Sequence, residues 1–178
     1  MKIGLIRHFR VLHPYPQKKL VETKELLQWF KDYDEAEIEI SEVDLLGVDW
    51  KYCYSSDLHR SLQTAEYIFP GEVVKRTELR EVPITPFKKR LKLPFLVWAM
   101  LVRLSWMTNK EKKNEIMKIR EGINKLLDEA LAQKGETLIV SHGALMIFMA
   151  KELKKRGFHG PKLGNPQNGK VYIFHNEE

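Results

Sequence analysis

Three short segments of the sequence place ionisable side chains directly after an apolar run. They are Ile3-Gly4-Leu5-Ile6 followed by Arg7-His8, Cys53-Tyr54 followed by Ser55-Ser56-Asp57-Leu58-His59-Arg60, and Leu138-Ile139-Val140 followed by Ser141-His142-Gly143. Taken singly, each histidine is compatible with a structural role and each arginine with a surface ion pair. Together, two arginines and two histidines at one crevice indicate an anion site, because desolvated cationic groups gain nothing there without an anion.

A phosphoryl group is the anion that best fits these residue types. Arginine binds phosphate oxygens in bidentate fashion, and an imidazole can attack phosphorus. Nearby guanidinium groups also favour the neutral, nucleophilic form of that imidazole. The pattern therefore predicts phosphoryl-transfer chemistry.

The side chains converge only if the apolar runs are neighbouring strands whose carboxyl ends share one edge of an open parallel sheet, where ligands bind. Short apolar runs and turn signals predict strands at 2–6, 50–54, 73–76, 137–140 and 171–174. Apolar stripes and breakers predict helices at 17–33, 55–69, 110–133 and 144–156. This alternation predicts an α/β fold, a three-layer sandwich with a mostly parallel central sheet flanked by helices.

The length of 178 residues favours a single domain over 1–178, and the looser stretch at about 83–109 reads as an insertion over the active site. A basic cluster in the insertion suggests a substrate with more negative charge than one phosphate; it comprises Lys88, Lys89, Arg90 and Lys92. The large apolar residues Phe95, Trp98, Trp106 and Met107 either line an apolar pocket, form a dimer contact or belong to the core.

Composition excludes a disordered or collagen-like chain, since 43% of the residues are hydrophobic and 30% are charged. The formal net charge of +6 is uneven: residues 1–74 hold 9 Lys/Arg and 13 Asp/Glu, whereas residues 75–178 hold 21 and 11. The single cysteine, Cys53, cannot form an internal disulfide, and the apolar run at 91–107 is interrupted by Arg103. We therefore expect a cytoplasmic protein that does not enter a membrane.

The three segments together resemble the signatures of the histidine phosphatase superfamily, with its phosphoglycerate mutase-like fold. Arg7-His8 matches the opening Arg-His-Gly motif except for Phe9, and Ser141-His142-Gly143 matches the third motif. The most specific match is the run 55–65 to Ser-Ser-x-Leu-x-Arg-(Ala/Ser)-x-x-Thr-Ala. Leu79-Arg80-Glu81 fits the position of the acid, and the order agrees over about residues 1–175.

The resemblance implies a mechanism and a set of site residues. His8 would form a phosphohistidine that water later hydrolyses, while Arg7, Arg60 and His142 hold the phosphoryl oxygens. Glu81 would be the general acid, and neither a metal ion nor another cofactor is implied.

The sequence departs from the family pattern after His8. Phe9 replaces a glycine, Arg10 and Val11 replace the residues that usually follow, and Pro14 replaces a common asparagine. Arg10 or His13 is a candidate for the missing phosphate contact; otherwise both belong to a solvated loop.

The short chain favours net hydrolysis of a small phosphorylated metabolite over mutase chemistry, because family mutases carry additional sequence after the first motif. Two alternatives to a phosphatase stay open: phosphoglycerate mutase-type transfer, and a catalytically weak relative that binds phosphorylated ligands. A nucleic-acid partner is disfavoured, because the basic run 151–156 is better interpreted as a solvated helix end. We expect a monomer or a homodimer.

Overall fold

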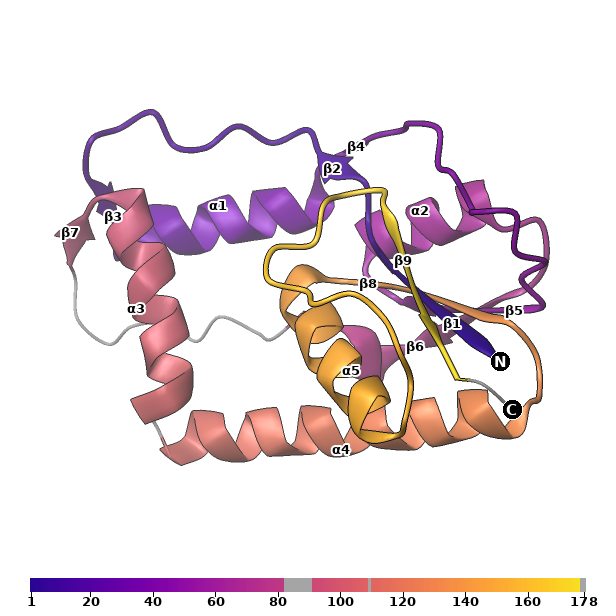
Figure 1. Ribbon diagram of the computed structural model, residues 1–178. Coiled ribbons are helices and arrows are strands. Elements are labelled where there is room, and N and C mark those ends of the chain that lie inside the picture. The colour runs from indigo at the N-terminus through magenta and orange to yellow at the C-terminus, as the bar shows by residue number, and fades with distance from the viewer. Residues whose placement is uncertain (82–90, 109, 177–178) are drawn as a thin grey trace.

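A five-stranded sheet forms the centre of the protein (Figure 1). The structure is a computed structural model and describes residues 1–81, 91–108 and 110–176. The strand order is β6-β5-β8-β1-β9, with bounds β1 Lys2–Arg7, β5 Tyr52–Ser56, β6 Val73–Arg76, β8 Thr137–Ser141 and β9 Val171–His175. The first four strands in this order are parallel and β9 runs antiparallel to β1, which confirms the predicted mostly parallel sheet.

Helices cover both faces of the sheet (Figure 1). Their bounds are α1 Thr23–Glu35, α2 His59–Ile68, α3 Phe95–Thr108, α4 Lys110–Ala132 and α5 Gly143–Lys155, with a 3-10 helix η1 at Thr77–Leu79. Alternate residues of β1 point to opposite faces, as the period of a strand requires. Ile3 and Leu5 pack with α4 and α5, and Ile6 belongs to the cluster on the α2 side. The three-layer architecture is thus confirmed.

The first helix differs from its prediction. The segment predicted as helical from residue 17 begins at Thr23, because β3 (Val21–Glu22) pairs with β7 (Lys92–Leu93) instead. Glu22 and Glu25 form a capping box that fixes this start. A second small sheet joins β2 (Arg10–Val11) to β4 (Ile38–Glu39), and strands of two residues are too short for periodicity to have predicted either pair.

The region expected to be an insertion contains β7 and α3, and α3 lies at the N-terminal end of α1 (Figure 1). Trp98 is fully buried against Val21 and Leu26, and its indole N–H donates to the Val21 carbonyl at 2.8 Å, so this residue belongs to the core. Lys88, Lys89 and Arg90 lie outside the described residues, as do the side chains of Trp106 and Met107. Among the described helices, none is long and apolar enough to cross a membrane.

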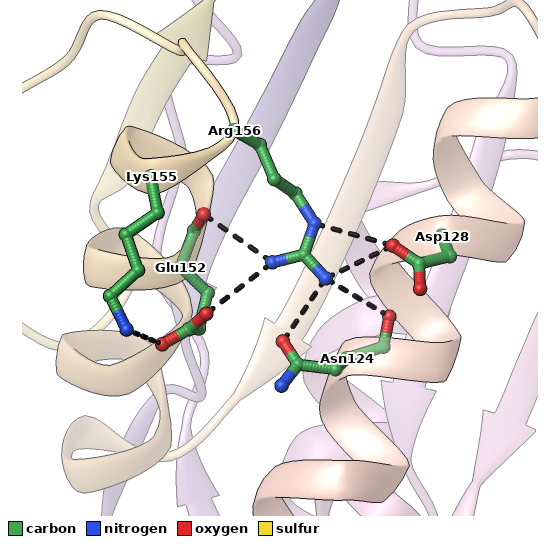
Figure 2. A network of polar contacts seen from close by, with 5 residues as sticks. All are labelled: Asn124, Asp128, Glu152, Lys155 and Arg156. Atoms are coloured by element: carbon green, nitrogen blue, oxygen red, sulfur yellow. Dashed lines mark hydrogen bonds and ion pairs between the residues drawn. The ribbon is translucent and has the colours of Figure 1, made fainter.

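A polar network ties the C-terminal end of α5 to α4 (Figure 2). The Arg156 guanidinium donates to Asp128 Oδ1 at 3.0 Å and to Asn124 Oδ1 at 3.1 Å, and it lies 3.5 Å from Glu152 Oε2. Lys155 pairs with Glu152 on the solvent side, at 2.7 Å. Arg156 therefore packs between two helices, whereas Lys155 is a solvated helix-end residue as expected.

Candidate active site

The sheet register brings the three chemistry-bearing segments to one edge. Arg7 pairs with Ser141 between β1 and β8, and Ser55 pairs with Val140 between β5 and β8. The His8 amide continues the ladder by donating to the Ser141 carbonyl at 3.1 Å. As a result the His8 and His142 rings lie with centroids 5.1 Å apart.

The His8 ring is held in one tautomer. Its Nδ1 lies 2.6 Å from the Phe9 carbonyl oxygen, and a carbonyl only accepts, so Nδ1 carries the hydrogen and donates it. Nε2 of the neutral ring then keeps a free lone pair. Because His8 also lines the cavity at this edge, Nε2 is the His8 ring nitrogen with a lone pair for a nucleophilic role.

Burial and positive charge keep His8 neutral. Desolvation is the largest effect, and the Arg60 charge adds to it, so the pKa of His8 falls to about 3 despite the opposing hydrogen bond to Phe9. Arg7 lowers it further. The pKa of His142 is also depressed well below its ordinary value, by burial and then by Arg60. Both imidazoles are therefore unprotonated near neutral pH.

His142 is fully buried beside His8 and is not one of the residues that line the cavity. Its Nε2 lies 3.0 Å from Ser56 Oγ, and that oxygen already accepts the Leu58 amide hydrogen bond. Ser61 Oγ also lies 3.4 Å from Nε2. A serine hydroxyl can donate to Nε2 or accept from it, so these contacts are compatible with a hydrogen on His142 Nδ1. Within the described residues, this Nδ1 and the Nε atoms of Arg7 and Arg60 have no hydrogen-bond partner.

The two arginines are anchored in different ways. Arg7 Nη1 donates to the Pro166 carbonyl at 3.0 Å. Arg60 Nη1 lies 2.6 Å from Asp34 Oδ1 and its guanidinium sits over the Tyr33 ring, 5.3 Å from the centroid. The side chain of Arg60 is 5% exposed and that of Asp34 is 53% exposed, so Asp34 carries a carboxylate to the mouth of the anion site.

A cavity of about 830 Å³ opens at this edge and is lined by Arg7, His8 and Arg60. Glu81 also lines it, two residues after η1 ends at Leu79. The preceding residue, Arg80, makes a bidentate pair with Asp57 of the second motif, which ties the Glu81 segment to that loop. The remainder of the wall is largely aromatic and aliphatic.

Arg10, a candidate for the phosphate contact, does not line the cavity. It lies in β2, its side chain is 75% exposed, and it pairs with Glu39 at 3.5 Å. The pairing of β2 with β4 turns it away from the cavity. His13 also lies outside the cavity lining, with its ring 5.3 Å from that of Trp29.

Several site residues were missed from the sequence. Asn168 Nδ2 donates to the His8 carbonyl at 2.7 Å, which helps to hold the loop that carries His8. Ser56 belongs to the second motif, and its position in that motif could have identified it as a site residue. No sequence pattern identified Asp34 and Tyr33, because their contacts with Arg60 depend on how α1 packs beside it.

No group of three or more His, Cys, Asp or Glu side chains gathers in the described residues in a way that could hold a metal ion. Arg7 and Arg60 carry positive charge beside His8, and Lys31, Arg80 and Lys118 also line the cavity.

Comparison with known proteins supports the assignment from the motifs. The sequence model of the histidine phosphatase superfamily (branch 1) matches residues 42–178, a span that begins after Arg7 and His8. No curated protein sequence matches the chain significantly.

Solved structures share the fold at low identity. A mycobacterial glucosyl-3-phosphoglycerate phosphatase is 18% identical with a TM-score of 0.59, covering 97% of this chain and 88% of its own. YhfR of Bacillus stearothermophilus is 15% identical with a TM-score of 0.57, covering 98% and 94%. The phosphoglycerate mutase of Bacillus anthracis is 17% identical with a TM-score of 0.54, covering 98% and 88%.

Proposed function

From the premise that the chain belongs to branch 1 of the histidine phosphatase superfamily and is a phosphoric monoester hydrolase, we propose that it cleaves small phosphorylated metabolites through a phosphohistidine on His8. The two guanidinium groups of Arg7 and Arg60 supply the positive charge that metal ions supply in other phosphoryl-transfer sites. The reaction therefore needs no metal ion.

In the first step, His8 Nε2 attacks phosphorus and the bond from phosphorus to the leaving oxygen breaks. The electron pair of that bond passes to the leaving oxygen, which takes a proton from the Glu81 carboxylic acid. The hydrogen bond from Nδ1 to the Phe9 carbonyl supports the positive charge that the ring gains. The products of this step are the free alcohol and a phosphohistidine.

In the second step, water attacks the phosphohistidine and the phosphorus–nitrogen bond breaks. Glu81 takes the proton from the water, and the electron pair returns to Nε2 of His8. Arg7 and Arg60 bind the equatorial oxygens in both steps. His142 does not line the cavity, but its Nδ1 has no partner within the described residues and its ring lies 5.1 Å from that of His8, so we assign it a hydrogen bond to one of these oxygens. Each residue thus serves both half-reactions.

One observation carries this proposal: His8 is neutral, fixed as the Nδ1–H tautomer, and set in a cavity wall between two arginines. A histidine buried for structural reasons alone would not require two guanidinium groups beside it, since each adds to the cost of burial. The arrangement favours a site built to receive an anion at Nε2.

The test uses 4-nitrophenyl phosphate in the presence of a chelator. The wild type should hydrolyse it, and His8→Ala should lose activity to the background level. His59→Ala is the matched control, because His59 is exposed and outside the cavity lining, and it should retain activity. Activity that survives in His8→Ala, or that needs an added metal ion, would overturn the proposal.

A second assay separates hydrolysis from mutase chemistry. The enzyme is incubated with phosphoserine, glucosyl-3-phosphoglycerate and 3-phosphoglycerate, compounds suggested by the names of the fold relatives. We expect inorganic phosphate to be released. Isomerisation of the phosphoglycerate with negligible phosphate release would instead assign a mutase.

A further inference from the structure

The cavity beside the phosphate site has a wall of aromatic rings that runs outward from Arg60. Trp29 and Tyr33 are close to parallel, with centroids 5.2 Å apart and planes 26° apart, and Tyr15 stacks on Trp29 at 5.9 Å and 12°. Phe95 meets Trp29 edge-on at 4.9 Å. We call these four residues, Tyr15, Trp29, Tyr33 and Phe95, the aromatic wall.

Three separate chain segments build the aromatic wall. Trp29 and Tyr33 are four residues apart on α1 and so lie on the same helix face, while Tyr15 comes from the preceding loop and Phe95 begins α3. All four line the cavity that contains His8. The wall is continuous with the phosphate site, because the Arg60 guanidinium lies over the Tyr33 ring.

The aromatic wall is more exposed than the core next to it, although Tyr33 and Phe95 also pack against core clusters. Trp98, the neighbouring core residue, is fully buried, whereas Tyr15 is 72% exposed and Trp29 and Tyr33 are half-buried. Burial of apolar area therefore does not account for the exposed parts of Tyr15 and Trp29. Its rings remain accessible from the cavity side.

The rings are also held in place before any ligand arrives. The Trp29 indole N–H donates to the Pro14 carbonyl at 2.8 Å, and Tyr33 lies between Trp29 and Arg60. Side chains fixed in this way lose little entropy when they bind a flat group. A cavity of about 830 Å³ has room for a phosphoryl group together with a ring of that kind.

We propose that the aromatic wall binds the leaving group, and that the preferred substrates are phosphate monoesters of alcohols that carry a flat aromatic ring. This inference rests on the proposed function and specifies its substrate class. Rings packed in stacked or edge-on geometry gain interaction beyond the area they bury, which a saturated group of similar size does not.

The test compares benzyl phosphate with cyclohexylmethyl phosphate, two primary-alcohol esters of similar size of which only the first carries a flat ring. Glycerol 1-phosphate serves as the polar reference. We expect kcat/KM for benzyl phosphate to exceed that for cyclohexylmethyl phosphate by about tenfold. Trp29→Leu should bring this ratio close to one, and Trp29→Phe should restore part of it.

Two further variants show whether the effect is specific to the aromatic wall. Tyr15→Leu should also lower the ratio, and it should fold because the ring it removes is 72% exposed. Tyr52→Leu, a change to a partly exposed tyrosine at the opposite end of β5, should leave the ratio as in the wild type. Equal kcat/KM for the two esters in the wild type, or an equal effect of Trp29→Leu on both, would overturn the inference.

A binding measurement separates this inference from the proposed function. Calorimetry with the His8→Ala variant gives affinities for the same esters without turnover. If no ester is hydrolysed by the wild type but benzyl phosphate still binds more tightly than cyclohexylmethyl phosphate, the catalytic proposal fails and the aromatic wall stands. If the two esters bind with equal affinity and the wild type hydrolyses them, the inference about the aromatic wall fails and the catalytic proposal stands.

Discussion

Asp34 places a carboxylate against the arginine that should receive the phosphoryl group, and Asp34→Asn tests that relation. The change keeps the size of the side chain and removes one negative charge 2.6 Å from Arg60 Nη1. A phosphate dianion bound to the same guanidinium would lie at about 6 Å from the carboxylate, where each would repel the other. Removing the carboxylate should therefore tighten phosphate binding.

The magnitude follows from the exposure of the two side chains. At about 6 Å, a dianion and a carboxylate repel by about 5.5 kcal/mol at an effective dielectric constant of about 20 and by about 1.4 kcal/mol in water. Asp34 is 53% exposed, so the value belongs near the lower limit. We expect the competitive inhibition constant of inorganic phosphate to fall by about tenfold, since about 1.4 kcal/mol corresponds to that factor.

The assay is inhibition of aryl phosphate hydrolysis by inorganic phosphate at constant ionic strength. Asp32→Asn is the control: it makes the same change in net charge on the same helix, but Asp32 pairs with Gln28 and not with Arg60. Its inhibition constant should change much less. Weaker phosphate binding in Asp34→Asn would refute the reasoning, and would show that Asp34 positions Arg60 rather than competing for it.

Three further changes test the packing and the electrostatics. In the wild type, unfolded His8 takes up a proton near pH 6.5 whereas folded His8 does so only at a pKa of about 3, so acid favours unfolding between about pH 7 and pH 4.5. In His8→Gln, the fall in unfolding free energy over that window should therefore be smaller by about 2–3 kcal/mol. Urea titration at both pH values measures the difference. Arg156→Gln should cost about 1–2 kcal/mol of stability, because it breaks the network between α4 and α5 (Figure 2). Lys155→Gln is the control: it removes only an exposed pair and should cost less than about 0.5 kcal/mol. Equal losses for the two variants in urea titrations would contradict this. Gly4→Ala should cost about 1–3 kcal/mol, since the added Cβ would lie 2.6 Å from the Trp50 ring, and an unchanged melting curve would show that the ring moves aside.

Sequence patterns predicted the sheet and the convergence of Arg7, His8, Arg60 and His142 because both depend on local features. A strand buried on both faces is apolar along its length. The residues that follow parallel strands all lie at the same edge of the sheet, because the carboxyl ends of the strands meet there. The start of α1 was not predictable in the same way. Residues 17–20 carry a helical pattern, but pairing of Val21 with Leu93, which is distant in sequence, sets the boundary.

The outer part of the site was beyond the reach of sequence patterns for a related reason. The pairing of Asp34 with Arg60 and the stacking of Tyr15 on Trp29 join segments whose contact depends on how α1 lies against its neighbours. Each residue alone is typical of a helix surface or a loop. Arg10 shows the converse, since its position two residues after the nucleophile suggested a phosphate contact but the two-residue pairing of β2 with β4 directs it to solvent.

Phe9 shows why a departure from a family motif can leave the geometry around His8 intact. Phe9 makes its polar contacts at the site through its backbone: its carbonyl accepts from His8 Nδ1, and its amide donates to Thr64 Oγ1 at 2.9 Å. Leu46 and Lys134 are the non-glycine residues with positive φ in the described chain, so Phe9 adopts a backbone conformation that does not require glycine.

The room for the Phe9 side chain comes from another part of the chain. Its ring is buried in the cluster on the α2 side, and a Cβ at Gly169 would approach that ring to 3.2 Å. Gly169, with φ of +67°, therefore provides both the turn before β9 and the space beside Phe9, and its amide donates to the Arg7 carbonyl at 2.9 Å. Gly169 in the last loop thus leaves the space that the Phe9 side chain needs. The tautomer of His8 depends on the backbone carbonyl at position 9, which glycine and phenylalanine both present.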